Sequence, residues 1–167
     1  MMGMLAAFIF AGQMLNTPVG GGTSGHMLGG VLAAVFLGPW TASLVMASVF
    51  IIQALLFQDG GITALGANII NMGLIGTIFG YYVYVNLNKF LKNTPLSAGI
   101  AAWMALVLGS LACAVELGLS GTVDVGIAVP AMVSVHMFIG LIEAGITSTS
   151  IAYVKSRRPD LLELPKV

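Results

Sequence analysis

The sequence predicts an all-α fold, a polytopic bundle of six transmembrane helices. Of its 167 residues, 58% are hydrophobic and only 7% are charged, and the mean hydropathy is +1.02. Soluble domains carry roughly 25% charged residues, so this chain has too few polar side chains to cover a water-facing surface. Lipid must therefore form part of its solvent. The six basic and six acidic residues cancel, so charge indicates no nucleic-acid partner.

Six apolar segments follow one another along the chain. A helix needs about 20 apolar residues to span the hydrocarbon core, and we expect helices over residues 1–16, 27–37, 40–57, 63–87, 96–119 and 127–154. The second segment is short for a crossing, so the prediction of six crossings depends on it. The first segment begins without a polar flank, and we expect these six helices to be the last six of seven. Residues 1–155 then form one transmembrane domain and residues 156–167 a C-terminal tail.

The basic residues occur in only two parts of the chain. Lys89 and Lys92 follow the fourth segment, and the other four follow the sixth. With six crossings both places lie on one side of the membrane, which the positive-inside rule assigns to the cytoplasm. We therefore predict a multi-pass protein of the inner (plasma) membrane with a cytoplasmic C-terminus. The loops that hold His26, Asp59 and Asp124 then face outward.

A glycine-rich loop surrounds His26. Glycines occupy positions 20, 21, 22 and 25 before the histidine and positions 29 and 30 after it. Glycine lets a backbone adopt positive φ and approach a ligand closely, and irregular backbone at membrane depth is tolerated where it lines a cavity. A neutral imidazole in such a loop is a candidate ligand for nickel, cobalt, copper or zinc. The alternative is a capping or hydrogen-bonding role, which a single loop histidine more often has.

Two ionisable residues lie inside the sixth segment. His136 and Glu143 are seven residues apart and therefore share one face of the helix. Ionisable groups within a membrane segment usually face the interior of the bundle, often for a functional reason. The alternative is a structural polar contact with a neighbouring helix, for which Asn68 and Asn71 of the fourth segment are the candidate partners.

Other polar residues interrupt the apolar segments singly. We expect Gln13 and Gln53, each in mid-helix, to form interhelical hydrogen bonds worth roughly 1 kcal/mol each. Glu116 is a further candidate for such a contact. The lone cysteine, Cys113, lies in an apolar run and is interpreted as a small core residue.

An intramembrane serine protease is the alternative from another functional class. Residues 22–25 read G-x-S-G, and Ser24 with His136 on a late helix would form a serine–histidine dyad. Rhomboid-type proteases resemble this outline, but residues 137–140 lack their H-x-x-G spacing. The sequence also has no G-x-x-x-x-G-K-[ST] motif, so it does not hydrolyse ATP through a Walker loop. An assembly subunit without a bound ligand is a third interpretation.

Three blocks of residues, in order, together resemble one known family. The first is GGTSGH at 21–26 with LGPW at 37–40, the second is QALLFQDGGITALGAN at 53–68, and the third, weaker block spans 130–147 with His136, Gly140 and Glu143. They are similar to the substrate-binding membrane subunits of cobalt and nickel transporters of the energy-coupling factor type, the CbiM/NikM family. The blocks cover nearly the whole chain.

The resemblance implies a metal-capture subunit, not an enzyme, that takes up Ni²⁺ or Co²⁺ as its substrate. Its implied partners are a transmembrane coupling subunit and ATPase subunits. It also implies that His26 ligates the metal, together with the terminal amine, a backbone nitrogen and an imidazole of an N-terminal Met-His segment. We expect Gln58, Asp59 and Asn68 to order the loops around His26.

The sequence departs from this family at its start. It begins Met1-Met2, and its first histidine is His26. Three explanations stay open: the N-terminal part is missing from this sequence, it is a separate small membrane subunit, or this member no longer binds metal. We favour the first.

Overall fold

The computed structural model describes residues 1–19 and 23–162. The helical elements are α1 (Met2–Gln13), α2 (Gly30–Leu37), α3 (Pro39–Ile52) with η1 (Gln53–Phe57), α4 (Leu65–Asn68) with η2 (Ile69–Phe79) and α5 (Gly80–Leu91), α6 (Thr94–Leu119), α7 (Val125–Arg157) and the 3₁₀ turn η3 (Pro159–Leu162). The segments η1 and η2 are π-helical continuations of the helices before them. The predicted all-helical bundle is confirmed. Three glycines of the predicted loop (20–22) and the last five residues of the predicted tail (163–167) lie outside the described residues.

Helix length separates these elements into two groups. In the described part of the chain, residues 39–57, 65–91, 94–119 and 125–157 form four helices long and apolar enough to cross a membrane, and α1 is a shorter apolar helix. The eight residues of α2 cover about 12 Å of a hydrocarbon core about 30 Å thick. The prediction that the second segment crosses the membrane is therefore wrong, because α2 is too short to span it.

Instead of crossing, α2 occupies the centre of the bundle. Seven of its eight residues are buried. One side of α2, including Val31 and Phe36, packs with alanines of α6. The other side, Ala33 and Ala34, packs with α3 residues that include Met46 and with Tyr81 of α5. A short helix surrounded by protein in this way gives the preceding loop, which holds His26, a rigid end point.

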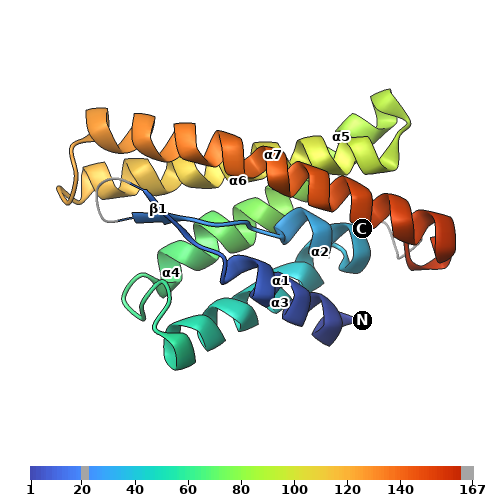
Figure 1. The fold of residues 1–167 in the computed structure, drawn as a ribbon, viewed down its shortest axis with the longest axis horizontal. Helices are drawn as coiled ribbons and strands as arrows, with labels where there is room; N and C mark the ends of the chain where they lie inside the picture. Colours follow the sequence, from blue (N-terminus) through green and yellow to red (C-terminus); the bar gives the residue numbers. More distant parts are fainter. Residues whose placement is uncertain (20–22, 163–167) are drawn as a thin grey trace.

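Figure 1 shows how the connections divide between the two ends of the molecule. The hairpin, the α3–α4 connection and the α6–α7 connection lie toward one end, on the left of the view. The α5–α6 connection and the C-terminal end of α7 lie toward the other. Lys155 Nζ donates to Thr94 Oγ1 at 3.2 Å there. The basic residues of α5, of the α5–α6 connection and of the end of α7 therefore gather at one end, and the sixth, Lys166, lies outside the described residues.

The predicted glycine-rich loop contains a small β-hairpin. β1 (Thr17–Val19) pairs antiparallel with β2 (Thr23–Gly25), and Val19 lies opposite Thr23. Val19 is buried against Ala114 of α6 and Met132 of α7. Packing on the α6–α7 pair therefore fixes the position of β1.

Side-chain caps define the starts of α6 and α7. Asn93 Oδ1 accepts from the backbone N–H of Leu96 at the start of α6, and Asp124 Oδ1 accepts from that of Gly126 at the start of α7. Such caps satisfy backbone donors that have no partner within the helix. Both helices begin two residues before their predicted starts.

The C-terminal segment continues as helix beyond its predicted end. α7 runs to Arg157, and Leu161 of η3 packs against the α2–α6 core. Arg158 forms a 2.8 Å ion pair with Asp160, and both side chains are exposed. The hydrogen bond from the guanidinium lowers the pKa of the Asp160 carboxyl. Exposed pairs of this kind contribute little stability.

Candidate functional site

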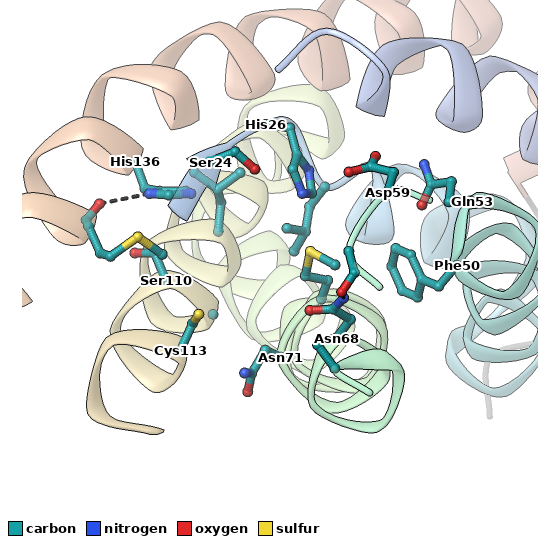
Figure 2. A pocket seen from close by; sticks show the side chains of 17 residues that line it. Ser24, His26, Phe50, Gln53, Asp59, Asn68, Asn71, Ser110, Cys113 and His136 are labelled. Atoms are coloured by element: carbon teal, nitrogen blue, oxygen red, sulfur yellow. Dashed lines mark hydrogen bonds between the residues drawn. The ribbon is translucent and has the colours of Figure 1, made fainter. Parts of the chain in front are cut away.

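A cavity of about 380 Å³ lies where the hairpin, η1, η2, α6 and α7 converge. Its polar and sulfur-bearing lining residues are Ser24, His26, Gln53, Asp59, Asn68, Asn71, Met72, Ser110, Cys113, Met132 and His136. Figure 2 shows His26 in the middle of this group, with Ser24 and His136 to one side and Asp59 and Gln53 to the other. The cavity brings together the two histidines of the chain.

His26 lies in the extended segment between β2 and α2. Its side chain is half-buried, and Nδ1 lies 3.0 Å from the carbonyl oxygen of Met27. In the tautomer that carries the proton on Nδ1, this nitrogen donates to the carbonyl and Nε2 keeps its lone pair. That neutral form is the one that binds a metal ion.

His136 projects from α7 into the same cavity. It is buried, and Nδ1 lies 2.7 Å from the carbonyl oxygen of Met132, one turn earlier in the helix. The other edge of the ring faces Gly25, where an added Cβ would lie 3.3 Å from Cε1 and 3.4 Å from Nε2 of His136. The His136 ring therefore packs against the residue directly before His26.

Glu143 contacts the same loop on the other side of His26. The side chain is 2% exposed, and its two oxygens accept the backbone N–H groups of Leu28 at 2.7 Å and Gly29 at 2.9 Å. Asn68 and Asn71, the candidate partners from the sequence, are not its partners among the described residues. The reason is that Leu28, whose side chain contacts Gly76 of η2, lies between η2 and α7.

Two glutamines hold the loop from the opposite direction. Gln13 of α1 donates from Nε2 to the carbonyl oxygen of Leu28 at 2.7 Å, and Gln53 of η1 donates to Gln13 Oε1 at 2.9 Å. Both glutamines are at least 95% buried. The interhelical hydrogen bonding predicted for Gln13 and Gln53 is confirmed, and the two side chains are bonded to each other.

The turn after η1 forms another wall of the cavity. Asp59 is half-buried and lines the cavity, and Asn68 donates to the carbonyl oxygen of Gly60 at 3.4 Å. Gln58 is exposed, has a φ of 55° and does not line the cavity. The structure thus places Asp59 and Asn68 near His26, with Gln58 outside.

Asn71 joins η2 to α6, so the interhelical polar contact predicted for Glu116 is confirmed. Its Nδ2 donates to Glu116 Oε2 of α6 at 2.7 Å. Its Oδ1 is buried without a hydrogen-bond partner in the part of the chain that the structure describes. Ser110 and Met132 also line the cavity, and nothing in the sequence distinguishes them from other core positions.

The described residues do not by themselves form a complete metal-binding group. Within residues 1–19 and 23–162, no three His, Cys, Asp or Glu side chains are arranged to hold a metal ion. Of the sequence-predicted site residues, His26 is the candidate ligand, and His136 lines the same cavity.

The protease alternative predicts a dyad that the cavity geometry does not favour. Ser24 lines the cavity with His136, but among the described residues no hydrogen bond joins its hydroxyl to the His136 ring. We expect a serine-reactive fluorophosphonate to leave the protein unlabelled at Ser24, because no base among the described residues is hydrogen-bonded to its hydroxyl. Mass spectrometry of the wild type and of Ser24→Ala checks this. Labelling that disappears in the variant would support the protease.

Comparison with known proteins identifies the family. The family model described as the cobalt uptake substrate-specific transmembrane region, CbiM, matches residues 1–161. The chain is 45% identical over 163 residues to a putative fused nickel transport protein, NikMN, of Archaeoglobus fulgidus, covering 96% of this chain and 55% of that one. It is 39% identical over 173 residues to a putative metal transport protein of Methanocaldococcus jannaschii, covering 96% of this chain and 76% of the relative.

A solved structure shares the fold. The crystal structure of a transition metal transporter aligns with a TM-score of 0.89 and 37% sequence identity, over 93% of this chain and 74% of that one. The chain therefore spans about half the length of the fused nickel relative and about three quarters of the other two. The match over residues 1–161 and these identities place the chain, a multi-pass membrane protein, in the CbiM family.

Proposed function

We propose that this chain is the substrate-capture subunit of an importer for a divalent transition metal, nickel or cobalt. The observation that carries the proposal is His26, an imidazole in a cavity among the helices of a CbiM-family protein. The relative from A. fulgidus is named a nickel transport protein, and both ions accept nitrogen donors. The metal is the cargo, and the protein acts as a binding subunit rather than an enzyme.

The chemistry of the cavity suits these ions better than magnesium or calcium. Imidazole is a ligand for nickel and cobalt, whereas magnesium and calcium prefer carboxylate, carbonyl and water oxygens. We propose His26 as a direct ligand, with the remaining nitrogen ligands supplied by a Met-His segment, as the family resemblance implies. Asp59 and Asn68, with Gln58 at the start of their turn, order the backbone around the site.

Transport requires partners and a defined orientation. We propose that a transmembrane coupling subunit and ATPase subunits drive import, because the sequence has no Walker loop of its own. The basic residues at one end of the molecule support a cytoplasmic C-terminus. Residues 1–155 then form the membrane domain of the inner (plasma) membrane, residues 156–167 its cytoplasmic tail, and the His26 loop faces the outer side.

Metal binding by the full-length protein tests this proposal. In equilibrium dialysis of the detergent-solubilised protein, we expect Ni²⁺ and Co²⁺ to bind, and we expect His26→Ala to weaken binding by more than about 100-fold, since even changes around metal ligands cost 10–100-fold. Ser48→Ala is the matched control, because the Ser48 hydroxyl is exposed and bonds to Leu44 of its own helix. It should keep the wild-type affinity.

Two results would contradict the proposal in different ways. Wild-type affinity in His26→Ala would remove His26 from the site while leaving metal binding intact. Absence of Ni²⁺ and Co²⁺ binding by the wild-type full-length protein would favour the non-binding assembly subunit.

A further inference from the structure

The contact between Glu143 and the His26 loop joins two parts of the chain that are far apart in sequence. The carboxylate lies 115 residues from Leu28, yet each of its oxygens accepts one backbone N–H of the loop, at 2.7 Å from Leu28 and 2.9 Å from Gly29. No Lys or Arg pairs with Glu143 among the described residues, where the ion pair is Arg158–Asp160. The two N–H groups at the start of α2 therefore supply the positive potential that a buried carboxylate requires.

The residues around His26 are held on both sides by α7. His136 packs against Gly25, directly before His26, and Glu143 binds the two N–H groups that follow Met27. His136 and Glu143 lie two helical turns apart on one face of α7. This one helix therefore contacts the chain both before and after His26. Within the described part of the chain, the His26 ring is hydrogen-bonded only to its neighbour Met27. The position of the imidazole thus depends on the backbone around His26, and contacts with α7 hold that backbone in place.

We infer that Glu143 is the positioning residue of the metal site, and that its carboxylate places the His26 imidazole in the cavity through Leu28 and Gly29. The part of this inference that concerns metal binding rests on the proposed function. Glu143 does not line the cavity, and its two oxygens accept the backbone N–H groups of the loop, so we place it outside the set of metal ligands. Its removal therefore changes where His26 lies and leaves the number of ligands unchanged.

Glu143→Gln is the variant that isolates this role. Glutamine has the same length, but it has one acceptor oxygen where the carboxylate has two, and its NH₂ group faces a backbone donor. The matched control is Ser148→Ala, which removes a hydrogen bond from α7 to the Pro95 carbonyl of α6 at 3.0 Å and leaves the loop untouched. A general loosening of α7 would affect both variants alike.

Two measurements on the full-length protein in detergent test the inference. The first is amide hydrogen exchange of the metal-free protein, in which we expect at least tenfold faster exchange over residues 26–29 in Glu143→Gln and wild-type rates there in Ser148→Ala. The second is titration with Ni²⁺ and Co²⁺. We expect Glu143→Gln to bind 10–100-fold more weakly and to show an altered Co²⁺ absorption spectrum at saturation, which a loss of stability alone does not produce.

The outcomes separate this inference from the proposed function. Wild-type exchange over residues 26–29 together with wild-type affinity and spectrum in Glu143→Gln would overturn the inference and leave metal binding standing. If the wild type binds no metal, the proposed function fails, and the exchange measurement alone decides whether Glu143 fixes the loop. If Glu143→Gln does not fold, Glu143→Asp replaces it. Aspartate keeps both acceptor oxygens but withdraws them by one methylene, so intermediate effects are expected, and wild-type values in both measurements would overturn the inference.

Discussion

Gly30→Ala is expected to lower the free energy of unfolding by about 2 kcal/mol, as overpacking of a close contact does. A Cβ on Gly30 would lie 2.7 Å from the backbone carbon and 2.8 Å from the Cα of Gly76 in η2. Both neighbours are backbone atoms, so relief requires a movement of α2 against η2 and not a change of rotamer. Thermal unfolding in detergent, followed by helical circular dichroism, measures the loss.

Gly145→Ala provides the opposite case for the same chemical change. Gly145 lies in α7, and an added Cβ would meet no atom within 4 Å. Because alanine is the better helix former by about 0.5–1 kcal/mol, we expect unchanged or slightly raised stability. Equal effects of the two substitutions would show that the contact between α2 and η2 is not tight. A displaced α2 should also weaken metal binding, because the His26 loop ends on it.

Gln13→Leu is expected to destabilise the protein by roughly 2 kcal/mol, the order of cost for leaving buried polar groups unpaired. The substitution removes the donor to the Leu28 carbonyl and the acceptor for Gln53. Gln13 is 1% exposed, so water cannot replace it without opening the core. We also expect weaker Ni²⁺ binding, since the loop loses its hydrogen bond to α1. Unfolding and metal titration of the same sample measure both effects.

A double-mutant cycle makes this prediction specific. In Gln13→Leu with Gln53→Leu, the unpaired amide of Gln53 is gone, so the double variant should lose less stability than the sum of the two single changes. Thr149→Ala, whose hydroxyl is exposed and bonds within its own helix, should be neutral. Additive losses would mean that the two glutamines do not depend on each other.

Together these contacts show how a membrane protein can hold an irregular loop. Small residues let α2 and η2 approach closely, as membrane helices do where no hydrophobic effect drives them together. Polar side chains from α1 and α7, namely Gln13 and Glu143, then satisfy the backbone of the segment after His26. Unpaired backbone groups are costly away from water, so Gln13 at the end of α1 and Glu143 within α7 are needed there.

The sequence by itself determined the class of the protein and its candidate ligand. The composition predicted that lipid is part of the solvent, and apolar length located the four long helices to within one or two residues of their observed starts. The glycines around His26 and the residues at 53–68 carried the family resemblance. The seven-residue spacing of His136 and Glu143 indicated a shared helix face. These properties follow from local composition and helical period, which a sequence displays directly.

Only the tertiary structure decided what these residues contact. The sequence did not reveal that α2 is buried at the centre of the bundle. An apolar segment has the same composition whether protein or lipid surrounds it. The spacing of Glu143 did not reveal its partners, because Leu28 lies 115 residues away and its backbone carries no sequence signal. Every residue has the same N–H group, so only packing selects the two that a buried carboxylate holds, and with them the position of His26.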